Sequence, residues 1–457
     1  MTNRTLRTGM VVAFIALIAL SPSTGFAVGS GGFENASFSA KQLGTGAAVT
    51  ATPDEPAAIS YNPAGIADLP GVQFQGDANF ISMLTFKENN DTGNSRSTGT
   101  LNLVPTGYVT INPGKIFNDK LALGFGMDSP FGLKDKYRSN DPSAKYTGYS
   151  NYLKMYTLKP TMAYKITDNI SVGGGPMWYR IDDFGGVQAY PSSLAGPTDG
   201  QVRLNSSGNH WGWQLGTLIK LTEKHRFGYY FRSPVVVKTS GLGKVENSTA
   251  GFPPFGSPSH AFETGIHTKL SLPMNMTWAY AYQPTPKTHY EADFTWSHWA
   301  THERITWVVD PVANPVDNSV MDQIRDAQKD WRDGFGLQLG ASHKLTKKLT
   351  LRGGSWFYWT PIPNKSFIPA VPDSNHLAVS IGAGYDINKY LTADLCYYNA
   401  FYFTRNVSNN FVKGSYTTYS QAFTVSVTMH WDDLFPRALG NKENKVETPS
   451  IDMKPVA

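Results

Sequence analysis

Two histidines have a spacing that could support chemistry. His298 and His302 lie four residues apart, which on one face of a helix would bring both rings to a metal ion. The stretch around them is typical of an aromatic strand and has no clear third ligand, so we expect no metal site. No serine nucleophile motif and no phosphate-binding loop stands out, and the single Cys396 cannot form an internal disulfide. The chain is therefore predicted to be no enzyme and to need no cofactor.

A second short motif, Asn62-Pro63-Ala64, lies in a stretch rich in Gly, Ala, Ser and Thr. Asn-Pro pairs often form the turn that ends a short helix, and local sequence alone favours such an ordinary turn. Any further role depends on the elements that surround the motif.

The beginning of the chain predicts export. Arg4 and Arg7 precede an apolar run from Met10 to Leu20, and small residues follow up to Ala27. This order is typical of a secretory signal peptide covering residues 1–27. The apolar run is too short to cross a bilayer as a helix, which argues against a membrane anchor.

Alternation of apolar and polar residues predicts β-strands throughout the rest of the chain. Leu377, Val379 and Ile381 alternate with small or polar residues, and so do Phe335, Leu337 and Leu339. Strands have a side-chain period of two, so one face can meet lipid while the other meets a lumen. A longer run from Thr268 to Tyr282 is predicted to place Leu270, Leu272, Met274, Met276, Trp278, Tyr280 and Tyr282 on a single lipid-facing side.

The connections between strands predict a membrane barrel. About fourteen strands are expected, beginning near residues 71, 101, 119, 149, 169, 203, 225, 262, 288, 333, 348, 376, 390 and 417. Short connections, such as 166–169 and 221–224, alternate with long ones, such as 129–148 and 309–332. Short periplasmic turns, long external loops and an even strand count are typical of outer-membrane barrels, and a soluble sandwich has no reason to segregate loop lengths.

Composition is compatible with this prediction. Charged residues make up 16% of the chain, against about 25% in typical soluble domains. The mean hydropathy of −0.30 does not argue against a membrane, because only every second strand residue would face lipid. The net charge of +5 includes no basic cluster that would indicate nucleic-acid binding.

We therefore expect four segments: a signal peptide at 1–27, an N-terminal segment at 28–70, a barrel at 71–431 and a polar periplasmic tail at 432–457. The N-terminal segment is too short for a core of its own, so it either hangs in the periplasm or folds into the lumen as a plug.

Several stretches, in a consistent order, resemble the outer-membrane transport proteins for long-chain fatty acids and aromatic hydrocarbons. The motif Asn62-Pro63-Ala64 resembles a sequence in the hatch of that family. The stretches 129–133, 212–216, 230–234, 272–273, 296–299, 330–333, 340–345 and 349–354 are also similar to family elements. Barrels of that family usually end at an aromatic residue. This chain departs from the family because a polar tail follows Trp431.

The resemblance implies an all-β, fourteen-stranded antiparallel transmembrane barrel with a small hatch in its lumen, monomeric and integral to the outer membrane. It also implies an inward kink in the third strand that makes a gap in the wall. A hydrophobic ligand (fatty acid, aromatic hydrocarbon or detergent) would be captured outside and would leave sideways into the outer leaflet, among membrane lipid and lipopolysaccharide. Asn62, Pro63 and Ala64 would hold the hatch.

Candidate site residues follow from this expectation. Gly124, Gly126, Pro130, Phe131 and Gly132 are candidates for the kink, because glycine permits bends and proline withholds a ladder donor. The two glycines could equally make room for the plug. A carboxylate ligand would need a basic lumen residue, and two lysines lie on the predicted polar faces of their strands, where solvation or pairing with the plug is the competing interpretation. They are Lys159 and Lys269. Phe131 and the stretch 252–255 could form an external apolar capture surface.

Two alternative functions remain open. A lipase-like or protease-like barrel enzyme would need a set of catalytic residues at the rim, and no such set can be recognised in the sequence. A structural or adhesive surface barrel would derive its role from the long loops, but the hatch motif would then have little purpose. The sequence does not choose between fatty acids and aromatic hydrocarbons.

Overall fold

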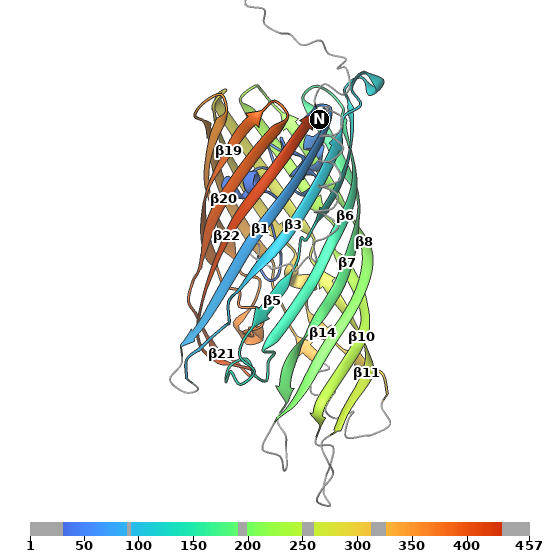
Figure 1. Ribbon diagram of the computed structural model, residues 1–457, viewed down its shortest axis with the longest axis vertical. Coiled ribbons are helices and arrows are strands. Elements are labelled where there is room, and N and C mark those ends of the chain that lie inside the picture. The colour runs from blue at the N-terminus through green and yellow to red at the C-terminus, as the bar shows by residue number, and fades with distance from the viewer. Residues whose placement is uncertain (1–30, 89–92, 191–198, 249–259, 312–325, 432–457) are drawn as a thin grey trace, which may run out of the picture.

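The protein is a closed antiparallel β-barrel, seen here in a computed structural model (Figure 1). The structure describes residues 31–88, 93–190, 199–248, 260–311 and 326–431. The predicted signal peptide, the polar tail and the stretch 252–255 lie outside them. No helix in the described ranges is long and apolar enough to span a membrane.

Fourteen strands form the barrel within the described residues, which confirms the predicted count. Three of them consist of two pieces each. In chain order they are β1 (Val72–Glu88), β3 (Thr100–Ile111), β4 with β5 (Leu121–Asp128, Leu133–Lys136), β6 (Ser150–Lys165), β7 (Ile170–Tyr190), β8 (Gly200–Lys220), β9 with β10 (His225–Arg232, Val235–Ser248), β11 with β12 (His260–Leu272, Asn275–Thr285), β13 (Thr288–Ser297), β17 (Gly334–Lys344), β18 (Leu349–Trp359), β19 (His376–Asn388), β20 (Leu391–Tyr402) and β22 (Lys413–Trp431).

The barrel closes because its first and last strands pair along their whole length. β1 pairs with β22 from Val72↔Trp431 to Glu88↔Ser415. The remaining helices and strands of the described residues are short. They are α2 (Ala40–Gly44), η1 (Pro56–Ser60), η2 (Pro63–Asp68), η3 (Gly114–Phe117), η4 (Trp299–Thr301), η5 (Asn364–Ser366), β2 (Ser95–Arg96), β14 (Arg304–Thr306), β15 (Val308–Val309), β16 (Asp326–Gln328) and β21 (Arg405–Ser408).

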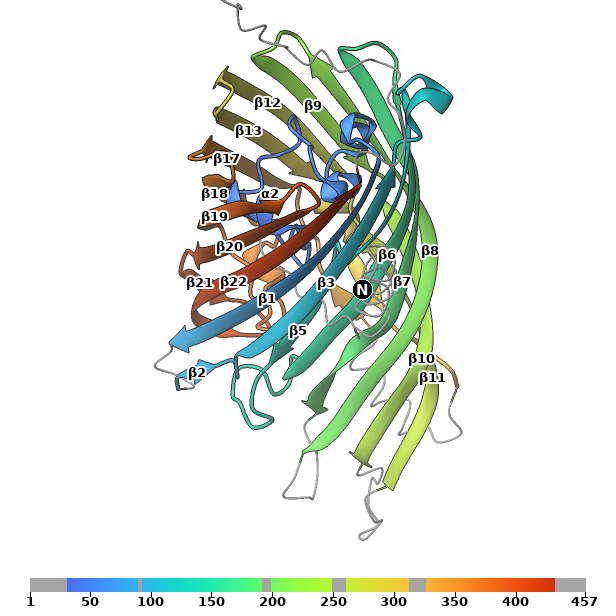
Figure 2. The same ribbon diagram turned by 45° about the horizontal axis from the view of Figure 1, so that its top comes forward.

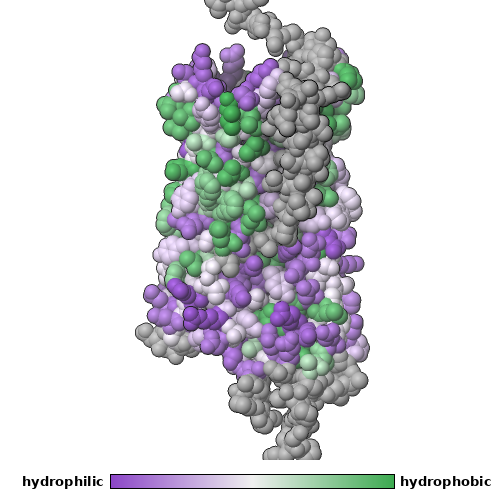
Figure 3. Space-filling view, in the orientation of Figure 1, coloured by the Kyte–Doolittle hydropathy of each residue, from purple (hydrophilic) through white to green (hydrophobic). Residues whose placement is uncertain are grey.

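The alternation predicted from sequence sets the two faces of the wall. On β19, Leu377, Val379 and Ile381 are exposed, whereas Ala378 and Ser380 are buried toward the lumen. The outward apolar side chains gather in a band toward the end with the short turns, and the opposite half of the visible face is mainly hydrophilic (Figure 3). The band matches the lipid-facing belt of an outer-membrane barrel.

One predicted strand face is wrong. The run from Thr268 to Tyr282 is not one strand, because β11 ends at Leu272 and β12 begins at Asn275. Leu272 and Asn275 are an odd number of residues apart and both are buried, so the alternation changes phase between them. Leu270 and Leu272 therefore point into the barrel, while Trp278 and Tyr280 on β12 face outward as expected. The neighbouring strand is also interrupted, between Arg232 and Val235, and each interruption contains a proline that cannot donate to the ladder.

Residues 31–70, here named the luminal segment, fold inside the barrel. Figure 2 shows this segment, in blue, enclosed by the strands near the end with the short turns. Most of its residues are buried against the wall. The core of the molecule is thus the contact between the luminal segment and the inner faces of the strands.

Candidate functional site

Carboxylates on β13 hold the middle of the luminal segment. The backbone N–H groups of Val49 and Thr50 donate to Asp293 Oδ2, at 3.3 and 3.1 Å, and the Ala51 N–H donates to Glu291 Oε1 at 2.6 Å. These irregular residues have no sheet or helix partners for those donors, so the wall satisfies them.

The motif Asn62-Pro63-Ala64 begins η2 and ties it to the wall. The Asn62 side chain accepts a hydrogen bond from the Ala64 N–H at 3.2 Å, which caps the short helix. Its amide nitrogen donates to the carbonyls of Thr50 at 2.7 Å and Thr217 at 3.0 Å. Pro63 occupies the first helical position, where a missing N–H costs nothing. The motif therefore starts a helix and bridges the luminal segment to β8.

Two glycines of the wall allow this close approach. A Cβ atom on Gly173 would lie 2.6 Å from the Pro63 carbonyl, and one on Gly216 would lie 2.2 Å from Asn62 Oδ1. At the end of η2, Asp68 forms ion pairs with Lys220 at 2.6 Å and Lys165 at 3.0 Å. Burial acts to raise the pKa of Asp68, but the two lysines hold it below its usual value.

Ladder pairing of the wall is interrupted beside the third strand. β3 pairs with β4 only from Gly107↔Met127 to Ile111↔Leu123, although β1 pairs with β3 up to Thr100. The two chains meet again where the Thr98 N–H donates to the Lys136 carbonyl at 2.7 Å. Between these points the edge of β3, Thr100–Thr106, has no ladder partner on the third strand within the described residues. We name this interval the wall opening.

A bulge of one residue accompanies the opening. Asp128 pairs with Thr157 and Leu133 pairs with Leu153, so four residues of the third strand, 129–132, oppose three residues of β6, 154–156. A surplus residue of this kind bends a strand, and here it lies between the end of β4 and the beginning of β5.

The candidate kink residues thus fall into two groups. Pro130, Phe131 and Gly132 lie in the interruption itself. Gly124 and Gly126 stay in the ladder, and a Cβ atom on either would lie less than 3 Å from a side-chain atom of Ile59 in the luminal segment. These two glycines make room for the luminal segment and do not interrupt the strand.

The beginning of the luminal segment pairs with the interruption from inside. The Asn35 N–H donates to the Pro130 carbonyl at 2.8 Å, and the Gly132 N–H donates to the Phe33 carbonyl at 3.0 Å. The ring of Phe33 packs 4.7 Å from Trp299 and 5.6 Å from Trp331, measured between centroids. Residues 33–35 therefore substitute for a neighbouring strand where the barrel wall provides none.

An apolar cluster lies behind these contacts, toward the end with the long loops. It comprises Phe33, Phe131, Leu153, Met155, Met177, Tyr179, Ile181, Val235, Val237, Leu270, Leu272, Trp299, Trp331, Ile362, Phe367, Val407, Val412 and Tyr416. Sequence reasoning assigned Leu270 and Leu272 to the lipid face and so missed their place in it. The prolines in the interruptions of β9–β10 and β11–β12 are the sequence feature that could have revealed the change of face.

A buried ion pair borders the apolar cluster. Arg232 pairs with Glu34 of the luminal segment, and the Arg232 guanidinium lies 4.6 Å from the centre of the Phe131 ring. Asn275 and Ser297 also donate to Glu34, at 3.2 and 3.0 Å. The pair bridges residues 198 positions apart in the chain, and no local pattern indicates it.

The structure shows where the two lysines predicted as head-group ligands lie. Lys159 is buried and paired with Asp128, and its Nζ donates to Ser60 of the luminal segment at 3.1 Å. The predicted lumen position of Lys269 is wrong, because the phase change at Leu272 places its side chain on the outer surface.

A third lysine, missed in the sequence, lies beside the apolar cluster. Lys329 belongs to the β13–β17 connection and is half-buried, and its backbone N–H donates to the Glu303 carbonyl at 2.7 Å. Burial lowers the pKa of Lys329 to about 8. Burial and then the charge of Lys329 lower the pKa of the neighbouring His302 to about 3. His302 is held by the Ser271 carbonyl at 3.2 Å, and its ring lies 4.6 Å from that of Trp331.

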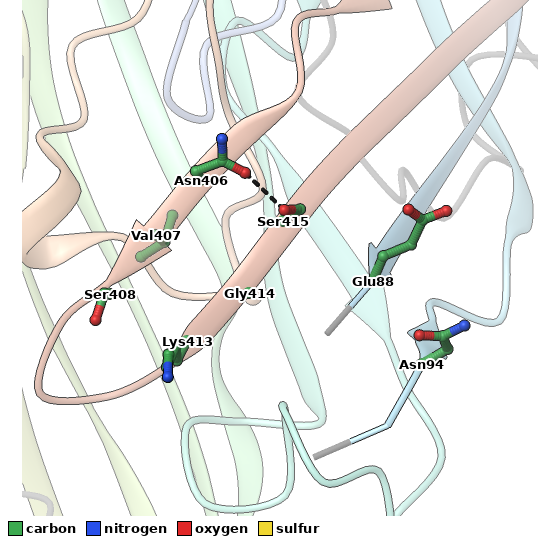
Figure 4. Close-up of a pocket in the computed structure, with 8 residues that line it drawn as sticks. All are labelled: Glu88, Asn94, Asn406, Val407, Ser408, Lys413, Gly414 and Ser415. Atoms are coloured by element: carbon green, nitrogen blue, oxygen red, sulfur yellow. Dashed lines mark hydrogen bonds between the residues drawn. The ribbon is translucent and has the colours of Figure 1, made fainter. Parts of the chain in front are cut away.

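Two cavities lie near the luminal segment and the external loops. A small one of about 60 Å³ is lined by Glu34, Arg232, Asn275 and Asp293, among others. A larger one of about 600 Å³ opens at the external ends of β1 and β22, between Glu88, Asn94, Asn406, Val407, Ser408, Lys413, Gly414 and Ser415 (Figure 4). The charged Glu88 and Lys413 in its lining do not suit capture of an apolar ligand. No group of three metal-ligating side chains occurs in the described residues, and His298 is bonded to Asp333 at 2.8 Å.

Residues 23–431 match the family described as Outer membrane protein transport protein (OMPP1/FadL/TodX). The match covers most of the chain. This protein belongs to that family. Its barrel is therefore an integral protein of the bacterial outer membrane, and the resemblance noted in the sequence is confirmed.

Relatives in the OMPP1/FadL/TodX family share about a quarter of their residues with this chain. The long-chain fatty acid transport protein of Escherichia coli K12 is 23% identical over 406 residues, covering 80% of this chain and 86% of that protein. Outer membrane protein P1 of Haemophilus influenzae is 24% identical over 335 residues, covering 66% of this chain and 67% of that protein.

Solved structures show the same fold. A Pseudomonas aeruginosa FadL homologue superposes with a TM-score of 0.73 at 18% identity, covering 89% of this chain and 99% of the other. The Pseudomonas putida toluene transporter TodX superposes with a TM-score of 0.65 at 16% identity, covering 86% and 98%.

Proposed function

We propose that this protein takes up hydrophobic compounds, either long-chain fatty acids or aromatic hydrocarbons, and releases them through the wall opening into the outer leaflet. The observation that carries the proposal is the interval of β3 that, within the described residues, has no ladder pairing with the interrupted third strand. A lipid-exposed sheet edge is unfavourable in hydrocarbon, so its presence here indicates a use. A dry route to the membrane core offers an apolar chain about 0.8 kcal/mol per buried CH₂.

The apolar cluster supports a waiting site for the ligand on this route. It adjoins Phe131 at the interruption and Phe33 at the beginning of the luminal segment. Moving residues 33–35 would break two backbone hydrogen bonds to the third strand and the bond from the Asn35 side chain to the Ser129 carbonyl. It would also break the Glu34–Arg232 pair and the hydrogen bonds that Asn275 and Ser297 donate to Glu34. The rest of the luminal segment would stay in place as a hatch, held by Asn62, Pro63 and Ala64, and would keep water-soluble compounds from passing.

Lys329 is our candidate for binding a carboxylate ligand. It lies beside the apolar cluster, and no described residue forms an ion pair with it. Its half-buried ammonium can form a charge-assisted hydrogen bond with a fatty acid head group. An aromatic hydrocarbon would need no such partner, so Lys329 separates the two substrate classes.

Deletion of Gly132 tests the route. The deletion leaves three residues of the third strand opposite three residues of β6. This should straighten the third strand and close the wall opening. We expect uptake of radiolabelled oleate and toluene to fall to the level of cells without the protein, while the barrel still folds. Gly132→Ala keeps the residue count and is the control. Undiminished uptake of both compounds by the folded deletion variant would overturn release through the wall opening.

The substrate class follows from the same uptake measurement in cells with and without the unmodified protein. If neither oleate nor toluene enters faster with the protein, the transport proposal is wrong.

A further inference from the structure

A groove of about 550 Å³ lies on the outer surface of the barrel, away from the wall opening. One side is the outward face of β10 and β11, and the other is the β13–β17 connection that includes β14 and β15. We name it the outer groove. The residues that matter to the argument are Val236, Lys238, His267, Lys269, Arg304 and Val308.

Two lysines face each other in the outer groove without a counter-charge. Lys238 and Lys269 are direct partners in the β10–β11 ladder, and both side chains are exposed. Such partners have Cβ atoms about 5 Å apart, and like charges at this distance repel. No described residue forms an ion pair with either lysine. Lys244, further along the same face, lies instead 3.8 Å from Glu246 and 3.6 Å from Glu263.

The other charges in the outer groove lie on its remaining walls. Arg304 and Glu303 come from the connection opposite the lysines. His267 is bonded to Ser240 at 2.9 Å, and its other ring nitrogen lies 3.4 Å from Asp310. Asp310 thus has His267 as its basic neighbour, and Glu303 lies next to Arg304 in the chain. Lys238 and Lys269 provide the anion site, with exposed Val236 and Val308 beside them.

The lysines lie at the outer edge of the membrane. Outward residues of the same strand pair nearer the short turns are apolar, among them Phe227, Trp278 and Val236. From Phe227 to Val236 the tilted strand rises about 23 Å, close to the height of about 25 Å of a lipid-facing band. Lys238 is the next outward residue beyond Val236. Its ammonium is therefore expected at the level of lipid head groups.

We propose that the outer groove binds a phosphorylated glycolipid of the outer leaflet, with one phosphate between Lys238 and Lys269. A phosphate would remove the repulsion between the lysines and accept charge-assisted hydrogen bonds from both. Val236 lies on the membrane side of the phosphate, where an acyl chain of the same lipid begins. Lipopolysaccharide, through the phosphates of its lipid A, has this chemistry and this position.

Native mass spectrometry of the full barrel in detergent tests the proposal. The protein is titrated with bis-phosphorylated lipid A and with the dephosphorylated lipid. We expect the unmodified protein to bind the phosphorylated lipid at least tenfold more tightly. The double variant K238Q/K269Q should lose this preference, each single variant should lose part of it, and the control K244Q should keep it. All variants are checked for the heat-dependent gel shift of a folded barrel.

Three results would overturn the proposal. They are equal binding of the two lipids, an unchanged preference in folded K238Q/K269Q, and an equal loss in K244Q. Inorganic phosphate is the further comparison. If it displaces the lipid at concentrations similar to those of lipid A itself, the groove binds free anions and the glycolipid assignment is wrong.

Discussion

The two ends of the luminal segment are held by different kinds of contact. Residues 33–35 meet the wall through the aromatic rings around Phe33, two backbone hydrogen bonds and the Asn35 side chain bonded to the Ser129 carbonyl. The buried Glu34–Arg232 pair, with hydrogen bonds from Asn275 and Ser297, completes this set. Residues 49–68 are tied through wall carboxylates, the Asn62 bridge to β8 and the two ion pairs of Asp68. The first set adjoins the wall opening and the apolar cluster, whereas the second lies toward the short turns.

This difference indicates that the two ends of the luminal segment have different roles. Apolar contacts can be exchanged for a hydrophobic ligand at little cost, because the ligand offers the same kind of surface. Buried hydrogen bonds cannot be exchanged in this way, since an apolar ligand leaves the donors and acceptors unpaired. Because the Phe33 ring belongs to the apolar cluster beside the wall opening, we expect the end near Phe33 to respond to ligand and the end near Asn62 to stay closed.

The largest effect is expected from Arg232→Gln. The substitution leaves the buried Glu34 carboxylate without its counter-charge, which typically destabilises a protein by about 3–5 kcal/mol. Urea unfolding of the barrel in lipid vesicles would measure the loss. The double variant E34Q/R232Q should recover part of it, and no recovery would show that Arg232 acts mainly through its packing on Phe131.

Asn62→Ala tests the opposite end. It removes three hydrogen bonds, each worth about 1 kcal/mol, so we expect a loss of roughly 3 kcal/mol. Cells should also become more sensitive to large hydrophilic antibiotics if the hatch loosens. The matched control is Asn169→Ala in an exposed turn. Equal sensitivity of the two variants would contradict the anchoring role.

A smaller effect is expected from Gly173→Ala. The added Cβ would press on the Pro63 backbone, and overpacking of this kind costs roughly 1–3 kcal/mol. Gly353→Ala is the control, because its Cβ would meet nothing nearer than 3.9 Å. The difference in unfolding free energy between these two variants isolates the contact with the hatch. A difference near zero would mean that the motif is not held tightly.

The smallest effect concerns pH. Lys329 has a pKa lowered to about 8, so it is charged below that pH and loses its charge above it. Affinity for ionised oleate should be constant below pH 8 and fall by up to tenfold per unit above it, about 1.4 kcal/mol. Toluene affinity should not change, and Lys329→Met should abolish the pH dependence for oleate. A persisting dependence in that variant would exclude Lys329 as the head-group partner.

The sequence supplied most of the fold and little of the site. Strand positions followed from a period of two, which is local, and the strand count is confirmed. The interruption at Pro130–Gly132 was also predicted, because proline and glycine act locally on the ladder. The roles of Gly124, Gly126, Lys159 and Lys269 depended on which surface each residue meets, and that was not readable from neighbours in the chain.

Arg232 and Lys329 illustrate the limit most clearly. Each is an ordinary basic residue in sequence. Arg232 is placed over the Phe131 ring by the fold, and burial by the fold lowers the pKa of Lys329. The switch of side-chain face after Leu272 similarly depends on two interruptions at neighbouring positions of adjacent strands, β9–β10 and β11–β12.

The amino-acid sequence by itself thus determined an exported chain with alternating strands and loops of two lengths, because these patterns arise within a few residues. The tertiary structure decided where the wall opens, which lysines are paired and which leucines face inward. Those properties depend on strand register and on contacts between the wall and the luminal segment, which join residues hundreds of positions apart.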